Sequence, residues 1–345
     1  MSIARTTSRP FVQYDVKKSD IAFEERAYYK YILEIDSEDF DLVKKSLTSL
    51  CEFINQPENI IKLVSLGLLK SFNKRLDYED DYARLKSFEI VKKFSRNSFG
   101  HENVKKEIDF EILKKALYKP DPLFKVRVEV CEILERFSLF QQDRFFLIEH
   151  MLPYVFIDNI LNEHDDIQHK FLSILINFIE IKSTQLIIYG AMVTMKKLLK
   201  TECLSVRKMS VECISRLCMS IKGKFEAIRI GIVKDLAHFL LDINVIIQLE
   251  VCMALANIAL ITPGKREILK IEKLFEKVLL ILENSSGVDM IKPMRLIEVL
   301  CEVKSARELM LGKVDIFEKI ENNSDNYRIV RRHAKSCKEV ILWKP

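Results

Sequence analysis

Apolar residues recur along this chain at spacings of three and four, and the whole pattern returns about every 40 residues. Its clearest copy is Val-Arg-x-x-Ser-Val-x-Cys-Ile-x-Arg-Leu-Cys, from Val206 to Cys218. Seven further copies begin at Leu42, Ala83, Val126, Ile167, Ile247, Lys292 and Val330. A spacing of three and four places the apolar side chains on one face of a helix, so each copy predicts a long amphipathic helix.

A second helical stretch follows each long helix after a short break, and a glycine often opens it. Gly67, Gly190 and Gly231 occupy this position, where glycine permits a sharp turn between two short helices. One long and two shorter helices in a period of about 40 residues are typical of an armadillo or HEAT solenoid. We therefore predict an all-α, right-handed superhelical solenoid of about eight repeats.

Composition supports this fold, because only 8 glycines and 8 prolines occur in 345 residues and little of the chain can be loop. No run of alternating apolar and polar residues bounded by turn dipeptides predicts a strand. The predicted organisation is a flexible arm over residues 1–20, a leading helix over 21–37 and the solenoid over 38–345. Residues 326–345 form its basic capping helix.

The chemistry of a catalytic or metal site is weakly represented. Seven of the eight cysteines fall inside the long-helix pattern, which predicts reduced, structural thiols, and no Cys-x-x-Cys or glycine-rich phosphate loop occurs. His164 and His169 bracket Asp165 and Asp166, and we interpret them as a solvated capping turn, since no further cluster completes a metal site. We expect no enzyme activity, cofactor, metal or small-molecule substrate.

Membrane insertion and nucleic-acid binding are not expected either. The first 20 residues lack the apolar core of a signal peptide. The longest uncharged stretches, 183–195 and 251–264, are shorter than the ~20 residues that span a bilayer. The chain carries a net charge of only +5, and no nucleic-acid reading motif occurs in it.

The concave groove of such a solenoid is lined by its long helices, and positions about 3, 6 and 10 residues after each repeat start should be exposed there. These rows predict partner-binding residues Lys45, Lys86, Lys93, Arg136, Asn177, Arg216 and Asn257. They form a broken basic stripe, which favours an acidic or amphipathic partner segment; a solvated face fits the same residues. Import adaptors and catenins resemble this repeat, but their regular asparagine and tryptophan ladders are missing.

The C-terminal segment is the most basic part of the chain. Residues 326–345 hold six lysines or arginines and one acid, a balance equal to the whole chain's +5. Val330, Ala334, Cys337 and Ile341 share one helical face and should dock on the preceding repeat. Two interpretations of the remaining bases stay open: a polar cap on the terminal repeat, or a docking element for an acidic partner that uses Arg331, Lys335 and Lys338.

Three short motifs carry a resemblance to a known family: Ile21-Ala22-Phe23-x-x-Arg26-Ala27, Thr262-x-Gly264-Lys265 and Val340-Ile341-x-x-Lys344-Pro345. With the length and repeat layout, they make the chain similar to the radial spoke protein 14 family, armadillo-repeat proteins of motile cilia and flagella. The resemblance implies a non-enzymatic scaffold of the axonemal radial spoke that binds other spoke subunits. The alternatives are an armadillo adaptor of the central apparatus or dynein-docking complex, and a regulatory adaptor of the catenin or import type.

Overall fold

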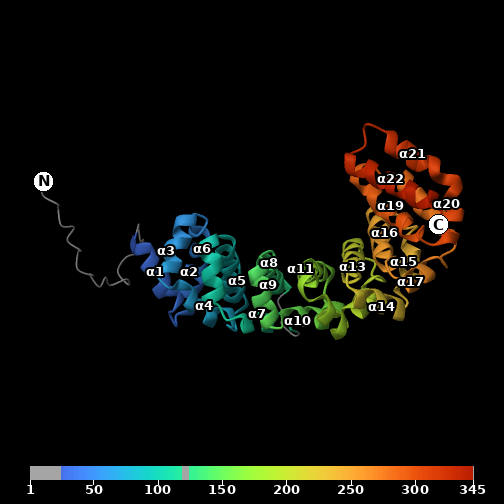
Figure 1. Ribbon diagram of the computed structural model, residues 1–345. Coiled ribbons are helices and arrows are strands. Elements are labelled where there is room, and N and C mark those ends of the chain that lie inside the picture. The colour runs from blue at the N-terminus through green and yellow to red at the C-terminus, as the bar shows by residue number, and fades with distance from the viewer. Residues whose placement is uncertain (1–24, 119–123, 345) are drawn as a thin grey trace, which may run out of the picture. The chain divides into compact units, whose positions relative to one another are not determined.

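The computed structural model describes residues 25–118 and 124–344, and every regular element in these two ranges is a helix (Figure 1). The predicted all-α class is confirmed. A long helix begins one or two residues ahead of every predicted repeat start. These long helices are α2 (Phe40–Phe53), α5 (Asp81–Arg96), α8 (Phe124–Ser138), α11 (Asp165–Tyr189), α13 (Leu204–Leu217), α16 (Val245–Ala259), α19 (Ile291–Leu300) and α22 (Arg328–Leu342).

Shorter helices connect the long ones, mostly in pairs. They are α3 (Pro57–Ser65), α4 (Leu68–Leu76), α6 (Ser98–Glu107), α7 (Phe110–Leu117), α9 (Gln141–Glu149), α10 (Leu152–Asn159), α12 (Ala191–Leu198), α14 (Ile221–Arg229), α15 (Ile232–Phe239), α17 (Thr262–Ile268), α18 (Leu274–Glu283), α20 (Lys304–Met310) and α21 (Val314–Asn322). Single 3₁₀ turns are η2 (Ile160–Asn162), η3 (Gly287–Met290) and η4 (Leu311–Lys313).

Polar capping residues explain where several long helices begin. The Asp39 carboxylate accepts hydrogen bonds from the backbone N–H groups of Asp41 and Leu42 at the start of α2. The Asn244 side chain accepts from Ile246 and Ile247 at 2.9 and 3.3 Å. Such caps satisfy N–H groups that have no partner within the helix, so they set the first turn just ahead of the apolar stripe.

The predicted glycine turns are confirmed, since Gly67, Gly190 and Gly231 have φ values of +84°, +105° and +72°. The corresponding turns before α10 and α18 are made by residues with side chains, Met151 (φ +61°) and Lys273 (φ +53°). An L-residue in this left-handed region is destabilised by contact between its Cβ and the backbone. These two turns therefore carry local strain that the glycine turns avoid.

Replacing Met151 or Lys273 by glycine should stabilise the protein. Both side chains are exposed, so little packing is lost. Relief of the left-handed strain outweighs the greater freedom of glycine in the unfolded chain, and we expect a net gain of about 0.5–1 kcal/mol per site. Urea denaturation followed by circular dichroism measures it. Gly231→Ala is the inverse control and should lower stability; equal midpoints for all three variants would contradict the assignment of strain.

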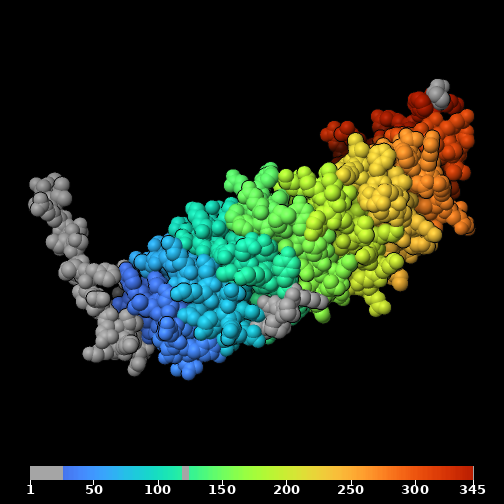
Figure 2. Space-filling model, turned by 90° about the horizontal axis from the view of Figure 1, so that it is seen from below, coloured from blue at the N-terminus to red at the C-terminus, as the bar shows by residue number. Residues whose placement is uncertain are grey.

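The chain forms two compact units, with the division passing through α7 and α8. Of the described residues, the first comprises 25–113 and 124–130, and the second 114–118 and 131–344. In the first unit α2 packs on α5, and Phe72 and Phe94 meet edge to face with ring centres 6.4 Å apart. In the second unit α11, α13, α16, α19 and α22 pack in succession. Within each unit, Figure 2 shows surface colours that follow sequence order, as stacking on neighbours requires.

The leading helix and the long helix of the fourth repeat have bounds that differ from the predicted ones. The leading helix is α1 (Glu25–Ile35), while the predicted arm 1–20 and residues 21–24 lie outside the described residues. Helix α11 runs for 25 residues because a short helix continues it after a kink at Lys182. By length and composition α11 is the one described helix long enough to cross a bilayer, but half of its most apolar window is buried. Because α11 packs against α13, its apolar character is accounted for by the core.

Candidate partner-binding surface

The predicted groove residues of the first unit differ in how free their charges are. Lys45 is exposed, and no ion pair holds it within the described ranges. Lys86 donates to Glu89 Oε2 at 2.7 Å, and this hydrogen bond raises the pKa of the lysine. Lys93 Nζ donates to the Cys51 carbonyl at 2.6 Å, which ties α5 to the long helix before it. Only Lys45 therefore offers an uncommitted charge in this part of the stripe.

The two predicted asparagines of the second unit also form hydrogen bonds with the preceding repeat. Asn177 Nδ2 donates to Ser138 Oγ at 2.9 Å, and Asn257 Nδ2 donates to the Ser215 carbonyl at 3.0 Å. The prediction that this row is exposed is wrong for Asn257, which is only 7% exposed. The long helices pack so closely there that its amide satisfies the end of α13 instead of facing solvent. These two amides hold repeats together.

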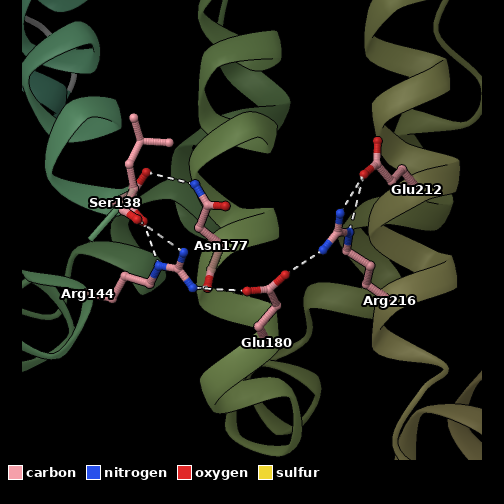
Figure 3. Close-up of polar contacts among 7 residues, drawn as sticks. Ser138, Arg144, Asn177, Glu180, Glu212 and Arg216 are labelled. Atoms are coloured by element: carbon pink, nitrogen blue, oxygen red, sulfur yellow. Dashed lines mark hydrogen bonds and ion pairs between the residues drawn. The ribbon is translucent and has the colours of Figure 1, made fainter. Parts of the chain in front are cut away.

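Charged side chains form a continuous network across three consecutive repeats (Figure 3). Arg144 on α9 donates to the Ser138 carbonyl at 2.6 Å and to Glu180 Oε2 at 3.0 Å. The other oxygen of Glu180 accepts from Arg216 Nη1 at 2.7 Å, and Arg216 also donates to Glu212 at 3.1 Å. Glu180 on α11 thus joins a guanidinium from each neighbouring repeat. Arg216, predicted as a partner-binding base of the stripe, is held between two carboxylates.

Further ion pairs neutralise the long-helix face of the second unit. Each joins a base to an acid of the preceding repeat: Lys170 Nζ to Glu132 Oε1 at 3.4 Å, Lys292 Nζ to Glu250 Oε1 at 2.7 Å, and His333 Nδ1 to Glu298 Oε2 at 3.8 Å when the imidazole is protonated. Arg136 instead lies over the Phe140 ring, 5.2 Å from its centre. The predicted basic stripe is thus largely a face of paired charges in this unit, because acids of the same rows, Glu132, Glu250 and Glu298, lie beside bases of the next repeat.

The C-terminal helix α22 buries the predicted face. Val330, Ala334, Cys337 and Ile341 are at most 1% exposed, as expected for docking on the preceding helices.

The three bases predicted for docking differ in their surroundings. Lys338 Nζ lies 2.7 Å from Glu321 on α21, a hydrogen bond that raises the pKa of the lysine. Lys335 is exposed and 3.8 Å from Glu339 one turn on, while Arg331 is half-buried. Lys338 thus links two helices of the terminal repeat, and Lys335 is the most accessible of the three.

A row of bases that the sequence reasoning missed caps the ends of the long helices. The Nδ1 atom of His101 lies 3.2 Å from the Ser95 carbonyl oxygen, and Lys224 and Arg307 donate to carbonyls of Met219 and Cys301. Positive charge at a helix C-terminus complements the helix dipole and satisfies free carbonyls. Arg144 belongs to the same row. A base 18 residues after the starts at 83, 126 and 206 is the signal that could have identified it.

Reactive groups are not assembled on this surface. Burial raises the pKa of the Cys218, Cys252 and Cys301 thiols to about 12, so they are protonated and weak nucleophiles at neutral pH. His164 occupies the N-cap position of α11 without a side-chain capping hydrogen bond, and its Nδ1 atom lies 3.8 Å from Asp166. Across residues 25–118 and 124–344, no three metal-ligating side chains converge. The surface offers hydrogen bonds and exchangeable ion pairs, which suit the binding of a polypeptide.

Comparison with proteins of known structure identifies the fold of this chain. No family model matches the chain. Two engineered proteins of solved structure resemble it at 17% identity: one has a TM-score of 0.77 over 92% of this chain and 78% of its own, the other 0.57 over 67% and 96%. A designed armadillo repeat protein in complex with the peptide (KR)4 resembles it with a TM-score of 0.59, also at 17% identity, over 66% of this chain and 98% of its own. This chain therefore has the fold of an armadillo-type helical solenoid.

Proposed function

We propose that this chain is a non-enzymatic adaptor that binds other proteins through its solenoid surface. The observation that carries the proposal is the face of the long helices, where polar side chains bond from repeat to repeat, as in the network centred on Glu180. A surface whose side chains are already ordered loses little conformational entropy when a partner binds. The designed relative that holds a peptide supports this use of the fold.

Within that class we propose a structural subunit of the radial spoke in motile cilia and flagella. Support comes from the sequence resemblance, of which the motifs at 262–265 and 340–345 fall largely in the described part of the chain. An adaptor of the import type is less favoured, because the Asn177 and Asn257 amides are already engaged with serines of the neighbouring repeat. The cytoplasm and the ciliary axoneme are the proposed location.

Stepwise extraction of axonemes from cells that express the tagged chain tests the spoke assignment. We expect the chain to co-purify with the spoke complex and with other spoke subunits. Recovery with the central apparatus or a dynein-docking complex would assign the chain to that assembly instead. Absence from axonemes would contradict the ciliary proposal but not the proposal that the chain is an adaptor.

The C-terminal helix supplies a sharper test of spoke attachment. Arg331, Arg332 and Lys335 changed together to glutamine should leave the melting temperature near that of the parent, because none of them has an ion pair beyond α22 within the described residues. Exposed or half-exposed bases without such a pair contribute little to folding, typically under about 1 kcal/mol each. Attachment to an acidic partner depends on such charges, so we expect the triple variant to be lost from purified spokes.

Lys338→Gln is the matched control on the same helix. It removes the bond to Glu321 on α21 and should lower the melting temperature more than the triple variant does. Full retention of the triple variant in spokes would show that α22 is only a cap.

A further inference from the structure

A cavity of about 430 Å³ opens between the short helices of two consecutive repeats, away from the long-helix face. The pairs α14–α15 and α17–α18 enclose it. Its apolar lining comes from Ile228, Val233, Ala237 and Ile271, of which Val233 is buried and the others half-buried. This volume falls within the range of about 300–1,000 Å³ that is typical of ligand pockets.

Uncommitted bases surround this apolar lining. Lys234 and His238 project from α15 and Lys277 from α18, and none of their three side chains forms an ion pair or hydrogen bond with the part of the chain that the structure describes. Two acids also line the cavity. Glu267 is bound to Lys270 at 2.5 Å, and Glu272 is exposed. The cavity therefore keeps an excess of free positive charge.

Several bases on the long helices of the second unit are paired with carboxylates, whereas these bases on the short helices are not, within the described ranges. There Lys170, Arg216 and Lys292 each have a carboxylate from the preceding repeat. On the short-helix side the series of free bases continues to Lys197 and Lys200, exposed at the end of α12 and likewise without a partner among the described residues. The short-helix side of the second unit thus carries lysines that pair with no described carboxylate, and two of them, Lys234 and Lys277, line the cavity.

We propose that this cavity docks an acidic amphipathic segment of a partner protein. An apolar side chain of the segment enters between α15 and α18, and its carboxylates pair with Lys234, Lys277 and the ring N–H of His238. An apolar anchor in a pocket with charged groups at the rim is the usual anatomy of a protein interface. The acids Glu267 and Glu272 and the apolar floor disfavour a nucleic-acid backbone. The inference goes beyond the spoke assignment, since it states partner chemistry whatever assembly contains the chain.

Fluorescence anisotropy with synthetic peptides tests the proposal on the full chain. The probe is a labelled amphipathic helical peptide with leucines on one face and glutamates on the other. We expect the Lys234→Glu/Lys277→Glu variant to weaken its binding at least about tenfold, and raised salt to weaken binding to the parent protein. Ala237→Phe, which fills the cavity without changing charge, should weaken binding similarly.

Matched controls separate this site from general attraction to a basic protein. Lys74→Glu/Lys106→Glu makes the same charge change at two exposed bases of the first unit that lie outside the predicted stripe, and it should leave binding unchanged. A peptide with serine in place of leucine, and an oligothymidine of equal charge, should bind at least about tenfold more weakly. Equal binding by the cavity variants and the parent, or equal binding of oligothymidine and the acidic peptide, would overturn the proposal. Neither outcome bears on co-purification with spokes.

Discussion

Leu255→Asp is expected to lower the free energy of unfolding by at least about 4 kcal/mol. Leu255 is 0% exposed in α16, which packs against α13 on one side and α19 on the other. An aspartate there loses the packing of a leucine and places a carboxylate in an apolar interior without a partner. Because each repeat is stabilised by its neighbours, the loss should spread to the repeats on both sides of α16.

Urea denaturation monitored by circular dichroism measures this effect, and Leu241→Asp is the matched control. Leu241 follows α15 and is 59% exposed, so its replacement should change stability by no more than about 0.5 kcal/mol. A Leu255→Asp protein as helical and as stable as the Leu241→Asp protein would contradict the packing of α16 in the core.

Gly223→Ala should destabilise the protein by about 3 kcal/mol, even though alanine favours a helix by about 1 kcal/mol over glycine. Gly223 lies in the first turn of α14, where an added Cβ would stand 1.9 Å from the Leu217 carbonyl oxygen and 2.6 Å from its carbon. Both atoms are backbone at the end of α13, so one helix must move to admit the methyl group. Gly264 lies against the end of α16 in the same way, since a Cβ added there would stand 2.0 Å from the Ile258 carbonyl oxygen.

Thermal melting compares Gly223→Ala with Gly312→Ala. A Cβ at Gly312 would meet no atom within 4 Å, so this alanine should be neutral or slightly stabilising. Equal melting temperatures for the two variants would mean that α14 does not approach α13 as closely as the structure places it.

Much of the fold was predictable from sequence because its signals are local. The apolar spacing of each copy predicted a long helix that the structure contains, and the turns at Gly67, Gly190 and Gly231 were predicted from single residues. Met151 and Lys273 adopt the same turn without the glycine signal, so only the coordinates identified them. The close contact of Gly223 with the preceding helix was missed, although glycine recurs 17 residues after the starts at 83, 206 and 247.

The sequence by itself determined the helical class, the repeat starts and the buried face of the C-terminal helix, because apolar periodicity acts within a few turns of one helix. Only the tertiary structure decided which charges are free. Arg216 meets Glu180, and Lys292 meets Glu250, at separations of 36 and 42 residues along the chain. Such pairs depend on how one helix stacks beside the next, which no local pattern encodes. The same stacking buried Asn257 against Ser215 and left Lys234 and Lys277 unpaired beside an apolar cavity.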